Sequence, residues 1–311
     1  MEMRTIYAQT LIEIAESDDR VVVLEADLMK ATGTGIFKER FPHRMFDVGV
    51  AEANMVGIAC GLSAGGKIPF AASFGCFASR KTYDQFFVSG NYARRNVKLV
   101  GTDPGISATF NGGTHMPFED VGIMRNIPGL VVFEPCDPVS LKKLLRCSAT
   151  HNGCTYMRLH RKPVVEIYTP DEEFELGKGN VLREGVDITL IASGAIMVHQ
   201  AVIAADMLMR EGISATLIDM HTVKPIDKDL VLKYARKTGV IVTCENHQII
   251  NGLGSAVAEV LAENYPILMK RIGINDEFGE VGTQDDLLVR FCLTATDIVA
   301  SIKELLIKRK Q

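Results

Sequence analysis

The sequence predicts an α/β protein made of two doubly wound domains with mainly parallel sheets. Short runs rich in β-branched residues alternate with longer helical stretches, which is the pattern of βαβ units whose sheets are covered on both faces. The alternation breaks once, at residues 161–186, where prolines, acids and glycines gather, and then restarts. We therefore predict a first domain at 1–168, a linker at 169–186 and a second domain at 187–311.

The individual elements follow from local pattern. In the first domain, apolar runs of strand length predict strands at 21–27, 68–73, 96–103, 130–135 and 154–160. Ile6, Leu11 and Ile14 share one stripe of a helix expected at 5–15, and Asp137 followed by Pro138 is typical of a helix N-cap and first turn. In the second domain we expect strands at 187–194, 214–220, 239–246 and 268–274, and helices at about 195–211, 227–238, 253–264 and 294–308.

Composition excludes several classes of function. The net charge is −4, and lysine and arginine are dispersed along the chain. The sequence therefore does not indicate the clustered basic patch that binds nucleic acid. No apolar run approaches the length of a membrane span, and acids interrupt the amino-terminal segment where a signal peptide would be apolar. Seven cysteines without a C-x-x-C pair predict free thiols. We expect a cytoplasmic protein with neither a membrane nor a nucleic acid as partner.

One acid, Glu52, opens a helix of small and apolar residues in the segment DVGVAEANMVGIACGLSAGG (47–66). A carboxylate at a helix amino terminus is favoured by the helix dipole, and this role is purely structural. Alternatively, a carboxyl group between Val50 and Met55 is poorly solvated and can share a proton with a ring nitrogen of a ligand. The residues alone leave both interpretations open.

Two further segments combine polar or aromatic side chains with a strand end. The loop at 103–120 carries Asn111 and His115 after a predicted strand, where ligands of open α/β sheets bind, although a single loop histidine is commonly a surface residue. Phe74 and Phe77 follow another strand and are spaced either to fill the core or to stack on a flat heterocycle. The paired glycines before His115 match neither a dinucleotide fingerprint nor a P-loop.

Taken in order, six segments of the chain resemble the pyrimidine-binding and carboxy-terminal domains of transketolase. They are LEADL (24–28), GVAEANM (49–55), FAASF (70–74), GGTHMPFED (112–120), FEPCDP (133–138) and ENHQIINGLGSAVAE (245–259), and the similarity covers essentially the whole chain. Deoxyxylulose-phosphate synthase and the β subunit of pyruvate dehydrogenase share this architecture. The resemblance implies thiamine diphosphate and Mg²⁺ as cofactors.

The resemblance also implies roles for individual residues. Glu52 corresponds to the glutamate that hydrogen-bonds the aminopyrimidine ring and activates the cofactor, and His115 to the histidine that contacts donor oxygens and shuttles protons. Further cofactor contacts are expected from Phe74 and Phe77, which pack on the pyrimidine, and from Asp27 and Leu28. The substrate-binding residues implied are Arg4, Thr32, Thr102, Asn111, His115 and Arg158, of which the two arginines would hold a sugar phosphate.

Three departures from the family pattern bear on the substrate. Asn111 stands where transketolases usually have aspartate, Ala31 replaces a serine near the substrate phosphate, and Thr102 takes the place of a phosphate-contacting histidine. We therefore expect fewer side chains to contact the substrate phosphate. A sulfonate in place of the phosphate, or a shorter ketose, is compatible with this pattern.

The chain lacks the G-D-G motif of the diphosphate-binding domain. We therefore expect a partner, the amino-terminal transketolase subunit, which carries that domain and the metal ligands, in an α₂β₂ heterotetramer where this chain also pairs with its own copy. The expected reaction is transfer of a two-carbon ketol unit from a ketose to an aldose. Two alternatives are the β subunit of a 2-oxo-acid dehydrogenase and a non-catalytic assembly or regulatory subunit.

Overall fold

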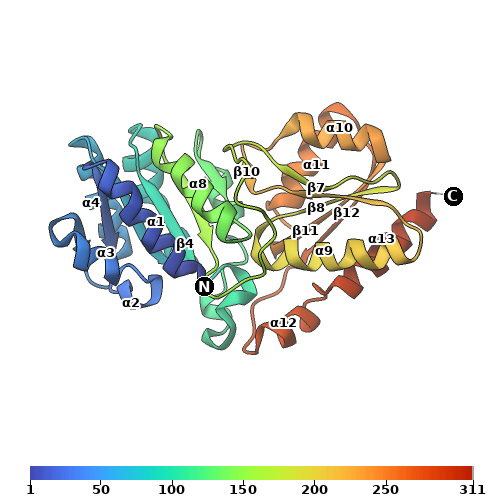
Figure 1. Cartoon of the computed structure of the whole chain (residues 1–311), viewed down its shortest axis with the longest axis horizontal. Helices are drawn as coiled ribbons and strands as arrows, with labels where there is room; N and C mark the ends of the chain where they lie inside the picture. Colours follow the sequence, from blue (N-terminus) through green and yellow to red (C-terminus); the bar gives the residue numbers. More distant parts are fainter. Residues whose placement is uncertain (310–311) are drawn as a thin grey trace.

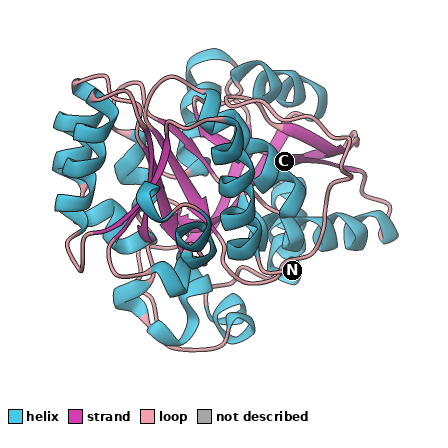
Figure 2. Ribbon diagram, turned by 60° about the vertical axis from the view of Figure 1, so that its left-hand side comes forward, coloured by secondary structure: helices cyan, strands magenta, loops and turns pink. Residues whose placement is uncertain are grey.

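The computed structural model describes residues 1–309, which form two α/β units lying side by side (Figure 1). Each unit is built on a mainly parallel sheet, and helices lie on either side of the strands (Figure 2). This arrangement confirms the predicted fold class. No helix within residues 1–309 combines the length and the apolar character needed to cross a membrane.

The first sheet contains six parallel strands that come from the first half of the chain. They are β1 (Val21–Glu25), β2 (Met45–Asp47), β3 (Ile68–Phe74), β4 (Lys98–Thr102), β5 (Val131–Phe133) and β6 (Thr155–Leu159), and they lie in the order β5-β6-β4-β3-β1-β2. Val22 and Leu24 of β1 enter one hydrophobic core, whereas Val21 and Val23 enter another. Because successive side chains point to opposite faces, both faces of this sheet are buried.

Helices connect these strands. They are α1 (Met3–Ser17), α2 (Met29–Thr32), α3 (Gly35–Arg40), α4 (Glu52–Ala64), α5 (Gly75–Arg80), α6 (Tyr83–Gln85), α7 (Asp120–Arg125) and α8 (Pro138–Thr150), with shorter helical turns at Pro42–Arg44, Phe86–Tyr92, Gly105–Asn111 and Gly113–His115. The predicted start of α8 is confirmed. The Asp137 side chain accepts from the Ser140 N–H at 2.8 Å, and the Ser140 hydroxyl accepts from the Asp137 N–H at 2.9 Å, so a capping box closes this end.

The second unit has a smaller sheet with the strand order β12-β11-β8-β9-β7. Its strands are β7 (Asn180–Arg183), β8 (Ile188–Ala192), β9 (Ala215–Asp219), β11 (Val240–Gln248) and β12 (Leu268–Ile274), and its helices are α9 (Gly194–Arg210), α10 (Lys228–Thr238), α11 (Leu253–Asn264), α12 (Gln284–Arg290) and α13 (Ala295–Arg309). β7 is antiparallel to β9 and lies inside the segment predicted as a linker, 169–186.

A short strand joins the two units. β10 (Thr222–Lys224) follows β9 but leaves its own sheet and pairs antiparallel with β5, where Thr222 lies opposite Phe133. The Lys224 ammonium then donates to the backbone oxygen of Arg125 at 2.6 Å. One hydrophobic core also contains residues of both units, including Met124 and Val231. The second unit is therefore packed onto the first, and its strand ends reach the same region of the molecule.

Candidate active site

Several of the predicted site residues lie at one edge of the first sheet, at or beyond the carboxyl ends of its parallel strands. Asp27 and Leu28 follow β1, Glu52 follows β2, Phe74 ends β3, and the loop that carries His115 follows β4. Parallel strands bring their carboxyl ends to a common edge, and open α/β sheets bind their ligands there. Residues up to about ninety positions apart in the sequence are thereby gathered into one region.

Glu52 is the first residue of α4, and its side chain is only 4% exposed. The helix that it opens buries Met55 and Val56 directly behind it. Its carboxylate lies 3.2 Å from the ammonium group of Lys81, whose side chain is 48% exposed. The expectation of a poorly solvated carboxyl group at this position is confirmed.

Two aromatic rings and one imidazole continue the site from Glu52. The Lys81 ammonium lies 4.3 Å from the centre of the Phe77 ring, and the Phe74 ring centre is 6.1 Å from that of Phe77. The His115 imidazole meets both rings edge-on, at 5.2 Å from Phe77 and 6.1 Å from Phe74. Both phenylalanines are half-buried, so part of each ring remains free to contact a ligand.

Glu52, Lys81, Phe77, His115 and Phe74 form a row of side chains, and two arginines lie at the Phe74 end of this row. The Arg161 guanidinium is 5.1 Å from the Phe74 ring centre, forms an ion pair with Asp103 at 2.6 Å and donates to the backbone oxygen of Ala31 at 3.1 Å. Arg4 donates to the same oxygen at 3.4 Å, and its side chain forms an ion pair with Glu2 at 2.6 Å. Burial raises the pKa of Asp103, and the neighbouring Arg161 opposes that shift. The result is a cationic end next to an aromatic surface.

The prediction that Arg158 binds substrate is wrong. Its side chain is 1% exposed and is held by two buried carboxylates, Asp120 at 2.9 Å and Glu134 at 2.7 Å. The remaining donor group bonds the backbone oxygens of Pro117 and Asn246 at 3.3 and 3.0 Å. Because Arg158 lies inside β6, its side chain enters the core of the molecule, whereas Arg161 lies beyond the end of that strand.

The predictions for Thr32 and Thr102 are also contradicted, since both residues are fully buried. The Thr32 hydroxyl donates to the Glu25 carboxylate at 2.6 Å and therefore faces the interior. Asn111 is exposed at the end of its helical turn, and Asp27 is exposed with a left-handed backbone (φ 62°). The roles of Asn111, Asp27 and Leu28 stay predictions.

Sequence reasoning missed Arg161 as a member of this region and left Lys81 open, either as a solvated charge or as an anion contact. A signal for Arg161 was present, because in MRLHR the second arginine follows the last apolar strand residue, Leu159. A side chain beyond the carboxyl end of a strand reaches the ligand edge, whereas one within the strand points into a face of the sheet. The sequence could not decide between the two roles of Lys81, because its neighbours Glu52 and Phe77 become close only in the folded chain.

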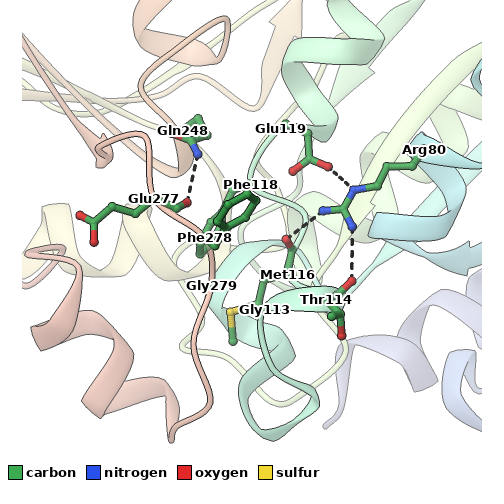
Figure 3. Close-up of a pocket in the computed structure, with 10 residues that line it drawn as sticks. All are labelled: Arg80, Gly113, Thr114, Met116, Phe118, Glu119, Gln248, Glu277, Phe278 and Gly279. Carbon is green, nitrogen blue, oxygen red and sulfur yellow. Dashed lines mark hydrogen bonds and ion pairs between the residues drawn. The ribbon is translucent and has the colours of Figure 1, made fainter.

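A pocket of about 680 Å³ opens between the loop that carries His115 and residues 277–279 of the second unit (Figure 3). Arg80 of α5 reaches into its wall, pairs with Glu119 and donates to the backbone oxygens of Thr114 and Met116 at 3.3 and 3.5 Å. These bonds hold the backbone on both sides of His115. Within residues 1–309, no group of three or more acidic, histidine or cysteine side chains is arranged to hold a metal ion.

Glu25 provides a prediction about pH. Burial raises the pKa of its carboxyl group to about 8, although the Thr32 and Thr34 hydroxyls donate to it at 2.6 and 2.8 Å. The neutral Glu25 carboxyl group contributes fully to the free energy of unfolding below its unfolded-state pKa of about 4.5. This contribution is lost as the pH rises through 8. We expect Glu25→Gln to be at least about 1 kcal/mol more stable than the wild type at pH 9, with no difference at pH 4. Urea unfolding at both pH values measures this, and equal gains at both would contradict it.

Comparison with known proteins places the chain in a family. The family model for the transketolase pyrimidine binding domain matches residues 1–165, and that for the transketolase C-terminal domain matches residues 177–298. A 6-deoxy-6-sulfo-D-fructose transketolase subunit from Clostridium sp. (strain MSTE9) is 52% identical over 302 residues, which cover 97% of this chain and 94% of that protein.

Two further proteins match over nearly their whole length. An apulose-4-phosphate transketolase subunit from Phocaeicola vulgatus is 34% identical over 304 residues, which cover 95% of this chain and 97% of that protein. The solved structure of a split-gene transketolase, in an inactive tetramer of β chains, has a TM-score of 0.91 and 42% identity and covers 99% of this chain and 98% of its own. The chain belongs to the transketolase family and is the C-terminal subunit of a split transketolase that works with a partner subunit.

Proposed function

We propose that the chain transfers a two-carbon ketol unit from a ketose with an anionic end to an aldose, at a site completed by the partner subunit. One observation carries this proposal. A buried carboxyl group, the lysine paired with it, two half-buried aromatic rings, an imidazole and two arginines form a continuous row of contacts at the ligand edge of the first sheet. This row contains the residue types needed to hold a heterocycle, move a proton and bind an anion.

The residues fit thiamine diphosphate, which when bound would supply a deprotonated, nucleophilic carbon for addition to the ketose carbonyl group. Glu52 is shielded from water and can hold a proton against a ring nitrogen, and Phe74 and Phe77 offer aromatic surface for a flat ring. We propose that the partner provides the diphosphate site and the ligands of Mg²⁺, and that the enzyme is an α₂β₂ heterotetramer. The cytoplasm remains the expected compartment, in keeping with the seven free cysteines.

The remaining residues of the row would act on the sugar. His115 lies beside the aromatic surface, and its Nδ1 is 2.9 Å from the Thr114 hydroxyl, which leaves Nε2 to exchange a proton with a donor oxygen. Arg4 and Arg161 can hold the anionic end, while Asn111 lies exposed at the end of the preceding helical turn. Arg161 takes the place that Arg158 was expected to fill.

For the anionic group we propose a sulfonate. The relative named for 6-deoxy-6-sulfo-D-fructose shares half of its residues with this chain, which is more than the relative named for a 4-phosphate sugar shares. A sulfonate carries one negative charge where a phosphate carries nearly two, so it needs fewer donors. This agrees with a site in which the threonines expected at the phosphate are buried.

The test is a transfer assay with the chain reconstituted with its partner subunit. The donors are 6-deoxy-6-sulfofructose and fructose 6-phosphate, the acceptor is glyceraldehyde 3-phosphate, and the products are measured by mass spectrometry. Higher kcat/KM for the sulfonate supports the proposal, and higher kcat/KM for the phosphate refutes the sulfonate assignment. Absence of transfer from either donor, together with oxidation of pyruvate by lipoamide, would favour the dehydrogenase alternative.

Arg161 provides a prediction about substrate affinity. Arg161→Gln is expected to raise KM for an anionic ketose by about tenfold to a hundredfold, the value of one or two hydrogen bonds to a charged group. Arg161→Lys should recover part of the loss, because lysine keeps the charge but not the planar fork. Steady-state kinetics measures both effects.

The matched control is Arg40→Gln, which removes an exposed arginine paired with Glu16. Its KM should equal that of the wild type. If Arg161→Gln raised KM equally for an uncharged ketose, a role in holding the anionic end would be excluded. A thermal melt of each variant checks that loss of the Asp103 ion pair has not unfolded the chain.

A further inference from the structure

We propose that Asn246, on β11 of the second unit, is a positioning residue that holds the loop carrying His115 in place for proton transfer. The proposal rests on the role of His115 proposed above. It assigns to the C-terminal domain a direct part in building the active site, through a side chain that itself touches neither substrate nor cofactor.

The Asn246 amide binds the beginning of this loop, residues 103–117. Its Oδ1 accepts from the Ile106 N–H at 3.0 Å, and its Nδ2 donates to the Pro104 oxygen at 2.9 Å. The side chain is 3% exposed, so water does not compete for these bonds. One group must donate and the other must accept, and an amide satisfies both where a carboxylate cannot.

Gly105 shows how closely the loop lies against this amide. Its backbone is left-handed (φ 51°), and a Cβ placed on it would lie 2.1 Å from the Asn246 Oδ1. A larger residue at position 105 would therefore have to push Asn246 away. Position 105 therefore has no room for a side chain while Asn246 stays in place.

The end of the loop is held by the same network. The Asn246 backbone oxygen accepts from Arg158 at 3.0 Å, and the same guanidinium nitrogen donates to the Pro117 oxygen at 3.3 Å. Arg158 also binds Asp120, the first residue of α7. Asn246 and Arg158 therefore hold residues on both sides of His115, one before it and one after it.

The loop needs these external bonds because its own structure is irregular. The turn Gly105–Asn111 is interrupted at Thr109, whose φ of 48° and ψ of −116° lie outside the helical region. A β-branched residue rarely adopts a positive φ. Such a backbone does not maintain itself by regular hydrogen bonding, so contacts from outside decide where His115 lies.

The strand that bears Asn246 ends where such a domain would normally bind a ligand. The sheet order changes direction between β8 and β11, and the crevice beyond these strand ends is the usual ligand site of an open α/β sheet. Here it is filled by protein. Glu134 of the first unit lies against Gly194, where a Cβ would come within 2.2 Å of its Oε1.

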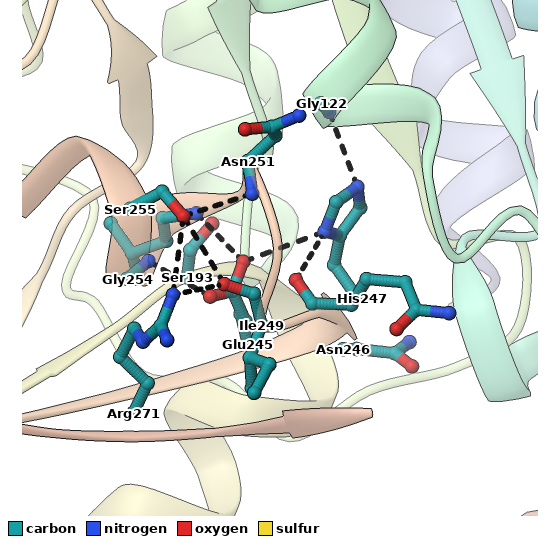
Figure 4. A network of polar contacts seen from close by, with 12 residues as sticks. Gly122, Ser193, Glu245, Asn246, His247, Ile249, Asn251, Gly254, Ser255 and Arg271 are labelled. Carbon is teal, nitrogen blue, oxygen red and sulfur yellow. Dashed lines mark hydrogen bonds and ion pairs between the residues drawn. The ribbon is translucent and has the colours of Figure 1, made fainter. Parts of the chain in front are cut away.

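The neighbouring helix end, the amino terminus of α11, is occupied by a carboxylate of the second unit itself (Figure 4). The Glu245 carboxylate accepts from the N–H groups of Leu253 and Gly254 at 2.7 and 2.8 Å, at the start of α11. His247 accepts from the Gly122 N–H of α7 at 3.2 Å. The ligand edge of the second unit thus serves as a clamp on the first unit.

The first test measures the loop directly and needs no activity. Hydrogen exchange of the isolated chain is followed by mass spectrometry for the wild type, Asn246→Asp and the control Glu259→Gln. The control breaks the Arg125–Glu259 ion pair, which also joins the two units but lies away from the loop. Faster exchange at residues 104–117 in Asn246→Asp but not in Glu259→Gln supports the clamp. Unchanged exchange in Asn246→Asp would overturn it.

The second test is a double-mutant cycle in the reconstituted enzyme. Asn246→Asp should lower kcat by about tenfold to a hundredfold, as expected for a misplaced catalytic group, with little change in KM. In a His115→Ala background the same substitution should have no further effect on kcat. A full additional loss in that background would overturn the positioning role, whereas wild-type kcat in His115→Ala alone would refute the proposed role of His115.

Gly105→Ala disturbs the same contact from the loop side and replaces Asn246→Asp should the latter fail to fold. The same loss of kcat, again absent in the His115→Ala background, is expected. Retention of wild-type kcat by a folded Gly105→Ala chain would overturn the proposal.

Discussion

Replacement of Glu52 by glutamine is expected to lower the turnover of the assembled enzyme by about a hundredfold or more, the usual contribution of a positioned acid or base. Glutamine has nearly the same shape and can remain beside Lys81, but it cannot take up and return a proton. Because the Glu52 side chain is only 4% exposed, water has poor access to replace it. Assay of ketol transfer by the reconstituted variant measures the loss.

The interpretation depends on the variant assembling and binding cofactor. Size-exclusion chromatography should give the same complex as the wild type, and titration with thiamine diphosphate should show binding. Glu211→Gln, which removes an exposed carboxylate paired with Lys303, is the matched control and should keep full activity. Turnover of the Glu52→Gln enzyme within about tenfold of the wild type would mean that this carboxylate only stabilises its helix, a role worth a few tenths to one kcal/mol.

Replacement of Arg158 by leucine is expected to destabilise the folded chain by about 3–5 kcal/mol, as is usual when one partner of a buried ion pair is removed. Asp120 and Glu134 would be left as buried carboxylates, and the Tyr156 hydroxyl, which donates to Asp120 at 2.7 Å, cannot neutralise them. Urea unfolding of the isolated chain measures the change in the free energy of unfolding.

The pH dependence of this loss identifies its cause. Burial raises the pKa of Glu134, and Arg158 opposes that shift, so the pKa should rise further in the variant. A buried carboxyl group with a raised pKa stabilises the folded chain while it is protonated, below the unfolded-state pKa. That stabilisation is lost as the pH rises through the folded-state pKa. The deficit of Arg158→Leu should therefore be larger at pH 8 than at pH 5.

Two comparisons complete this experiment. Arg146→Leu breaks an exposed ion pair with Glu13 and should cost less than about 1 kcal/mol. Adding Asp120→Asn and Glu134→Gln to Arg158→Leu should restore part of the stability by removing the unpaired charges. A deficit that is the same at both pH values and is not relieved by these substitutions would point to a packing defect instead.

Much of the fold could be predicted because the relevant signals are local. The apolar runs that form β1, β3, β4, β8 and β9 are continuous and flanked by turn residues, as expected for parallel strands buried on both faces. The start of α8 was likewise readable from Asp137 and Pro138. In contrast, β2 and β10 are only three residues long, and β10 pairs with a strand some ninety positions earlier. No local pattern specifies such a partner.

The site shows the same distinction between what local sequence signals predict and what they do not. Phe74, Phe77 and His115 follow strands that the sequence predicted, and parallel strands share their carboxyl edge. Glu52 follows β2, which was not predicted, and only the resemblance to transketolase assigned it to the same site. By itself, therefore, the sequence determined the fold class, the ligand edge and the family. Only the tertiary structure decided that Arg158 is a core residue and that Arg161 faces the site. The reason is that Asp120 and Glu134, which hold Arg158, come from positions 38 and 24 residues away, so the partners of a charged side chain are settled by packing and not by its neighbours in the chain.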